Sequence, residues 1–171
     1  MTTQPEPWLR GPVEGFEPLL MPVVHALTQA REDIESLVTT VPAAHVWERP
    51  GGAASIGFHV RHLGGALDRL FTYARGERLS DEQKTAARAE GEPEAPVQSL
   101  VLTVAGMNTL IDRAFKQLRV TSRDDLLIER KVGRAELPTT TMGLLFHAAE
   151  HSARHAGQAI STAKILAGGR S

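Results

Sequence analysis

The sequence contains no cysteine, and this absence removes several kinds of chemistry at once. Disulfides, thiolate zinc sites, iron–sulfur clusters and cysteine nucleophiles are all excluded, and a reducing compartment is favoured. Aromatic residues make up only 5% of the chain, so the large side chains that typically fill sheet cores are scarce. Apolar residues instead recur at spacings of three and four, which favours helices.

The sequence also lacks an excess of charge and long apolar runs. Nineteen Lys and Arg residues oppose twenty Asp and Glu residues, which gives a net charge of −1. Whole-chain charge therefore does not indicate binding to nucleic acid or to an anionic membrane. The first fifteen residues do not resemble a secretory signal, and no run approaches the roughly 20 apolar residues that span a bilayer. We expect a cytoplasmic protein without nucleic-acid or membrane partners.

Proline and glycine divide the chain into a short lead-in and one domain. Residues 1–18 contain four prolines and two glycines and are expected to be irregular, whereas residues 19–171 are expected to form a single domain. A first helix is predicted at 19–41, because Pro22 is tolerated in a first turn and Pro42 ends the segment. A second helix is predicted to begin after the N-cap Ser55 and to end at Gly76.

Two further helices are predicted in the second half of the chain. The third spans residues 97–119, which carry an apolar stripe at helical spacing. The fourth ends at Gly168-Gly169 and begins at one of three adjacent threonines that can each cap a helix: Thr139, Thr140 and Thr141. Gly64 and Gly65 lie inside the second helix at a cost of about 1 kcal/mol each, which indicates close helix packing there.

The connections are predicted to be long. Residues 80–96 are polar and charged, and they are expected to form a solvated connection with a short exposed helix in its first half and a loop in its second. The segment before the fourth helix lacks helical periodicity, which suggests an extended connection with a short hairpin around Gly133. Four helices of about 20 residues with such connections predict an all-α fold, a four-helix bundle.

Histidine is the residue type that points to chemistry. His147, His151 and His155 lie four residues apart on the fourth predicted helix, so neighbouring pairs are rotated by about 40° and can converge on one metal ion. The outer pair lies about 12 Å apart along the helix axis, which argues against a site that uses all three. His59 or His62 on the second helix can supply a further ligand, as in metal sites built from facing helices.

Structural explanations compete with a metal site for each histidine. A buried histidine is often a hydrogen-bonded core residue, and three histidines on one helix can form a polar face. His147 to His151 also matches His-x-x-Glu-His, an inverted zinc-protease pattern in which Glu150 is the base. We favour instead an exposed Glu150 that pairs with Arg154 at i+4.

Two histidines lie outside these clusters. His25, in the first predicted helix, is expected either to line a pocket or to support the metal ligands from behind. His45, in a loop beside Trp47, is expected at the surface and is assigned no role.

Two segments, SIGFHVRHLGGALDRLFTY and LLFHAAEHSARHAGQAI, resemble the DinB-like superfamily, which includes the YfiT-like metal-binding bundles. The resemblance covers roughly residues 20–168. In that family a His-Leu or His-Ile step lies in the second helix, and His-x-x-x-His followed by Gly-Gln lies in the fourth. His62 precedes Leu63 here, and His151 and His155 precede Gly157-Gln158. The resemblance therefore implies that His62, His151 and His155 bind a metal.

The family resemblance also implies partners and activities. It implies a divalent metal, zinc or nickel, and a homodimer. Some relatives are transferases that use a low-molecular-weight thiol such as mycothiol, bacillithiol or glutathione, and many have no established activity. His59 and His147 are additional histidines beside the matched positions, so the choice of ligands stays open.

Three imidazole ligands would leave coordination positions free for water or a substrate. A metal lowers the pKa of such a water to about 7, and it deprotonates a bound thiol. We therefore predict a metal-dependent enzyme of the thiol S-transferase or hydrolase type, acting on a small molecule. The alternative is a non-catalytic metal-binding or stress-response module whose metal stabilises the bundle. His59 is the candidate for a catalytic proton relay, and its alternative role is a hydrogen bond within the core.

Overall fold

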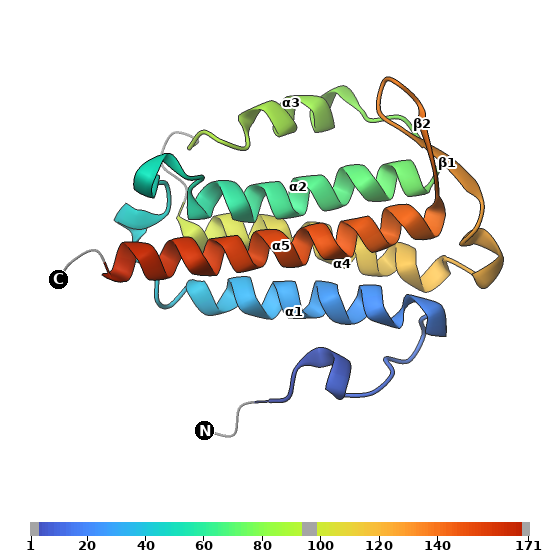
Figure 1. The fold of residues 1–171 in the computed structure, drawn as a ribbon, viewed down its shortest axis with the longest axis horizontal. Helices are drawn as coiled ribbons and strands as arrows, with labels where there is room; N and C mark the ends of the chain where they lie inside the picture. The colour runs from blue at the N-terminus through green and yellow to red at the C-terminus, as the bar shows by residue number, and fades with distance from the viewer. Residues whose placement is uncertain (1–3, 94–98, 169–171) are drawn as a thin grey trace.

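In a computed structural model, which describes residues 4–93 and 99–168, the chain folds into a helical domain with a small hairpin. Within these residues, four long helices lie side by side: α1 (Met21–Leu37), α2 (Ile56–Ala74), α4 (Leu100–Val120) and α5 (Thr141–Gly168). Helix α2 packs against both α4 and α5, and α1 packs against α5 (Figure 1). The predicted helical class is confirmed. In the described part of the chain, no helix combines the length and apolar character needed to cross a bilayer.

The second predicted helix has the bounds that its end signals indicate. The Ser55 hydroxyl accepts a hydrogen bond from the amide of Phe58 at 3.1 Å, so Ser55 caps the N-terminus of α2. Gly76 has a φ of 78°, and its amide donates to the carbonyl of Tyr73 at 2.8 Å. A residue with a side chain rarely adopts this φ, which explains why glycine follows the last turn.

Close packing between α2 and α4 explains Gly64. A Cβ atom at this position would lie 3.2 Å from the Cα atom of Met107 on α4. The missing side chain therefore lets the two backbones approach, as the sequence suggested. Buried aliphatic side chains from all four long helices form the core around this contact, including Leu27, Ile34, Leu63, Leu67, Ile111, Leu118 and Leu145.

Two of the predicted helix bounds were wrong by a few residues. Helix α1 ends at Leu37 rather than at Val41, and residues 38–40 form a turn in which the Thr40 amide donates to the Leu37 carbonyl at 3.1 Å. Helix α4 begins at Leu100, where Ser99 caps it, instead of at residue 97. Residues 97 and 98 lie outside the described part of the chain.

The connections contain regular structure of their own. Helix α3 (Asp81–Ala89) begins with a capping box between Ser80 and Gln83 and packs along α2, so the predicted short helix is confirmed. The loop predicted after it lies partly outside the described residues. Strands β1 (Glu129–Val132) and β2 (Leu137–Thr140) form an antiparallel hairpin around Gly133. The hairpin was expected, but the all-α class omitted this small sheet.

Helix α5 begins directly after the hairpin. The Thr140 hydroxyl accepts a hydrogen bond from the amide of Gly143 at 3.1 Å, so Thr140 is the capping residue among the three candidate threonines. This junction fixes the start of α5 relative to the hairpin. His151 and His155 then lie where α5 packs against α2.

Candidate metal site

Helices α2 and α5 bring His62, His151 and His155 together. One ring nitrogen from each histidine lies within 4.8 Å of the other two. The rings are also close, since the centroid of His155 lies 4.5 Å from those of both His62 and His151. His155 is buried, whereas His62 and His151 are partly exposed. The structure thus joins the three positions that the family pattern singled out.

The ring of His62 is oriented so that its Nε2 atom faces the cluster. Its Nδ1 atom lies 2.7 Å from a carboxylate oxygen of Glu90, and its Nε2 atom lies 2.9 Å from Nε2 of His151. An ionised carboxylate only accepts hydrogen bonds, so the Nδ1 atom of His62 carries a proton. In the neutral ring this leaves a lone pair on Nε2, which is the form that binds a metal.

Glu90 is the site residue that the sequence analysis missed. It follows the last residue of α3 and is only 5% exposed. One carboxylate oxygen accepts from His62, and the other accepts from Arg69 at 2.6 Å. Burial raises the pKa of Glu90, but the hydrogen bonds from His62 and Arg69 outweigh it, so the pKa is lowered overall. The carboxylate is therefore ionised although it is buried.

Gly65 makes room for this carboxylate. A Cβ atom at residue 65 would collide with the Glu90 carboxylate and with the Arg69 guanidinium group. The two adjacent glycines of α2 thus serve different contacts: Gly64 faces α4, and Gly65 faces the end of α3. No local signal in the polar segment 80–96 distinguished Glu90 from its acidic neighbours.

His59 supports the cluster from one turn before His62. Its Nδ1 atom lies 3.0 Å from Nδ1 of His155, and its side chain is buried. This contact occupies Nδ1 of His155 and leaves Nε2 available to a metal. Burial, together with the neighbouring imidazoles of His62 and His151, lowers the pKa of His155 to about 3. Burial likewise lowers the pKa of His59.

The donor set fits a divalent metal ion. Two nitrogens bound to one zinc ion in tetrahedral geometry lie about 3.3 Å apart, close to the 2.9 Å that separates the Nε2 atoms of His62 and His151. The Nδ1 atom of His151 is buried and has no hydrogen-bond partner among the described residues. Phe58 stacks on the ring of His62 at 5.1 Å and restricts its rotation. The three imidazole rings are thus held where they can bind one ion together.

His147 lies outside this cluster. It is exposed, and its Nδ1 atom lies 2.7 Å from a carboxylate oxygen of Glu150. Glu150 also pairs with Arg154 at 2.6 Å, as the i+4 spacing predicted. The first histidine and the glutamate of the inverted protease pattern therefore pair with each other on the outer side of α5.

The remaining two histidines have structural roles. His25 lies 3.0 Å from the carbonyl oxygen of Gly11 through its Nε2 atom, so it holds the N-terminal segment rather than the metal cluster. His45 was expected at the surface, but this was wrong, because it is buried and its Nδ1 atom lies 2.8 Å from Glu48. The loop folds back, and the indole of Trp47 covers Gly57 of α2.

Comparison with known proteins identifies the family and the fold. The sequence profile of the DinB superfamily matches residues 26–159, a range that contains all three clustered histidines. A similar fold occurs in the crystal structure of a DinB-like protein from Bacillus cereus ATCC 10987. The two chains are 14% identical and align with a TM-score of 0.62 over 85% of this chain and 91% of the other. No curated protein matches the sequence significantly.

Proposed function

Because this chain belongs to the DinB superfamily, we propose that it is a metal-dependent enzyme whose divalent ion, zinc or nickel, is held by His62, His151 and His155. The observation that carries the proposal is the convergence of one nitrogen from each ring within 4.8 Å. Two of these rings are partly exposed, so a small molecule can approach the ion. We also propose that the four long helices form a four-helix bundle.

The protonation states of the site favour metal binding. Burial lowers the pKa of His151 and of His155, so both imidazoles are neutral at physiological pH. Neutral imidazole is the form that binds a metal. Glu90 fixes the proton of His62 on Nδ1, and His59 occupies Nδ1 of His155. His62 and His155 would therefore each present Nε2 to the ion.

A divalent ion at this site supplies Lewis acidity, which makes water or a thiol a nucleophile near neutral pH. Since the chain contains no cysteine, a thiol must come from a small molecule. We propose a thiol S-transferase or hydrolase reaction on a small-molecule substrate. His59, one turn before His62 on α2, is proposed to accept the proton that the water or the thiol releases.

The proposed alternative is a non-catalytic metal-binding or stress-response module. The observation that favours it is that the cluster joins helices α2 and α5, so a metal would tie together segments that lie far apart in the sequence. A homodimer in the cytoplasm is proposed for either function, on the resemblance to the family alone.

The experiment is a transfer assay with protein whose metal content has been measured. Mycothiol, bacillithiol and glutathione are each tested with an electrophilic acceptor, and hydrolysis of an activated ester is measured in parallel. The enzyme proposal predicts turnover that requires the metal and that falls in His59→Ala at unchanged metal content. Protein that holds its metal but shows neither activity would favour the binding module.

A further inference from the structure

A second concave region lies away from the histidine cluster. It is a groove of about 1070 Å³ between the C-terminal end of α2, helix α3 and the β1–β2 hairpin. These elements meet at one end of the molecule (Figure 1). The volume is at the upper end of the range of small-molecule sites and far exceeds that of a single phosphate ion. Neither the metal ligands nor Glu90 line this groove.

The groove concentrates positive charge in a chain that carries a net charge of −1. Its lining contains seven cationic side chains and three carboxylates. Two of the carboxylates already pair with cations, Glu77 with Arg75 and Glu136 with Lys131. Glu129 is the one lining carboxylate without an ion pair among the described residues. The field inside the groove therefore favours anions.

Three guanidinium groups of the lining have no hydrogen bond or ion pair among the described residues: Arg78, Arg88 and Arg134. They come from the α2–α3 connection, from α3 and from the hairpin turn, so they approach the groove from three sides. Guanidinium groups donate paired hydrogen bonds to phosphate and carboxylate oxygens. Tyr73 and Leu79, both half-buried, give the same groove an apolar part.

The wall formed by the hairpin is fixed in place. The Nε atom of Arg130 on β1 donates to the carbonyl oxygen of Ala74, the last residue of α2, at 2.7 Å. A Cβ at Gly76 would make only ordinary van der Waals contact with the Arg130 side chain at 3.8 Å, so the φ of 78°, rather than this contact, requires glycine there. The bond from Arg130 attaches the hairpin to the C-terminal end of α2.

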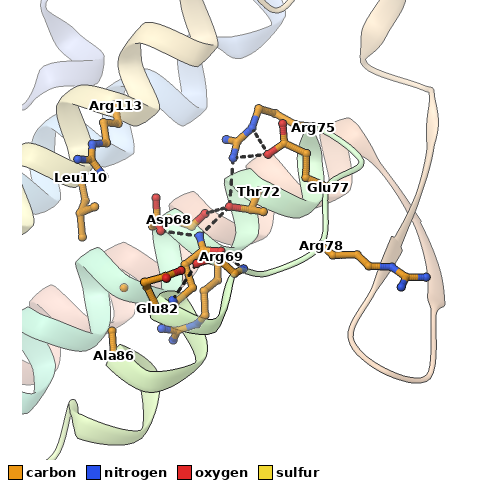
Figure 2. A pocket seen from close by; sticks show the side chains of 13 residues that line it. Asp68, Arg69, Thr72, Arg75, Glu77, Arg78, Glu82, Ala86, Leu110 and Arg113 are labelled. Atoms are coloured by element: carbon orange, nitrogen blue, oxygen red, sulfur yellow. Dashed lines mark hydrogen bonds and ion pairs between the residues drawn. The ribbon is translucent and has the colours of Figure 1, made fainter.

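A neighbouring pocket of about 520 Å³ provides a contrast. Several of its polar groups pair with one another, since Gln83 donates to Asp68 at 2.6 Å and to Thr72 at 2.8 Å, and Arg75 pairs with Glu77 (Figure 2). Arg78 lines both this pocket and the groove, and its side chain extends toward the hairpin (Figure 2). The polar side chains shared by α2 and α3 in the smaller pocket thus pair with one another, whereas Arg78, Arg88 and Arg134 have no hydrogen bond or ion pair among the described residues.

We propose that the groove binds a small organic anion with at least two negative charges, a phosphate ester or a polycarboxylate, with its apolar part against Tyr73 and Leu79. Arg78, Arg88 and Arg134 would bind the anionic groups. A long polyanion such as duplex nucleic acid fits less well, because the carboxylates of Glu129 and Glu136 interrupt the positive surface. This binding is separate from the proposed reaction and does not require the metal.

The test is isothermal titration of the full chain with phenyl phosphate, phthalate and inorganic phosphate, which differ in charge group and in apolar content. The double variant Arg78→Gln/Arg134→Gln removes two groove cations. Its matched control, Arg113→Gln/Lys116→Gln, removes the same charge from exposed residues of α4 that do not line the groove. Each titration is repeated in His155→Ala, so that ligation of the anion to a metal is detected as a separate event.

The proposal predicts 1:1 saturable binding of phenyl phosphate or phthalate, tighter than that of inorganic phosphate. Binding should weaken about ten-fold or more in the groove variant, because charge-assisted hydrogen bonds are lost, and less than about two-fold in the control. It should persist in His155→Ala. The relative affinities of phenyl phosphate and phthalate identify the preferred anionic group.

Four results would overturn the proposal. The first is the absence of saturable binding of either aromatic anion. The second is equal weakening in the groove variant and in the control, which would indicate an effect of overall charge. The third is binding only to duplex DNA or to anionic vesicles, which would assign the surface to a macromolecule. Loss of binding in His155→Ala alone would assign it to the metal site.

Discussion

Removing the Glu90 carboxylate tests whether the site is built for a metal. Glu90 holds the Nδ1 proton of His62 through a contact of 2.7 Å inside the protein, where it is only 5% exposed. Loss of a carboxylate that orients a histidine ligand typically weakens metal binding about 10- to 100-fold. This corresponds to about 1.4–2.7 kcal/mol of binding free energy. We expect Glu90→Ala to lie near the upper end of this range.

Glu90→Gln separates the shape of the residue from its charge. The amide oxygen can still accept from His62, but it carries no charge and leaves Arg69 without its ionic partner. We therefore expect a loss near the lower end, about ten-fold. Zinc affinity is measured by competition with a chromophoric chelator, and circular dichroism of the metal-free protein verifies that each variant is folded.

Glu150→Gln is the matched control. Glu150 also contacts a histidine at 2.7 Å, but that histidine is His147 on the outer side of α5. Its substitution should leave zinc affinity within about two-fold of wild type, because surface ion pairs contribute little. The reasoning is refuted if folded Glu90→Ala binds zinc as tightly as wild type, or if the control loses as much affinity as Glu90→Gln.

Three further predictions concern the histidines. Purified protein should contain about one divalent ion per chain, which His62→Ala and His155→Ala should lose and His147→Ala should keep. Mass spectrometry measures the metal content, and the reverse pattern would favour the inverted protease motif. Chelation should lower the melting temperature with little change in helix content, because metal at a hundred-fold excess over Kd stabilises the folded state by about 2.7 kcal/mol. An unchanged melting curve after verified metal removal would contradict a metal that joins α2 and α5. The pKa of His155 is lowered to about 3 in the folded state, whereas its unfolded value is about 6.5. Between these two pH values the unfolded chain binds the extra proton, so the free energy of unfolding should fall by about 1.4 kcal/mol for each pH unit below 6.5. Urea titrations of metal-free protein should show this slope, and they should show less of it in His155→Ala.

The sequence predicted those features that depend on contacts between residues close together in the chain. Ser55 and Gly76 mark the two ends of α2 through contacts with residues a few positions away, so their residue types predicted both ends. His151 and His155 share a face with apolar neighbours, and only the family resemblance selected His62 over His59. The side of α5 that faces α2 depends on packing across the whole domain, which spacing alone does not encode.

Glu90 and the basic groove were not predictable in this way. Glu90 reaches His62 across 28 residues, from a segment whose composition indicates only a solvated connection. The arginines of the groove come from separate segments, and the net charge of −1 conceals their convergence. Both features depend on where α3 and the hairpin dock, which is decided by tertiary contacts.

His62 on α2 contacts His151 on α5, and this has a consequence for the order of folding. The two residues are 89 positions apart, and α5 follows α1, α2 and α4 along the chain. The N-terminal helices can collapse earlier, but the donor set is complete only after α5 has docked. Metal binding therefore reports the docking of α5 against α2. If this docking follows the main folding barrier, a bound ion slows unfolding more than it accelerates folding.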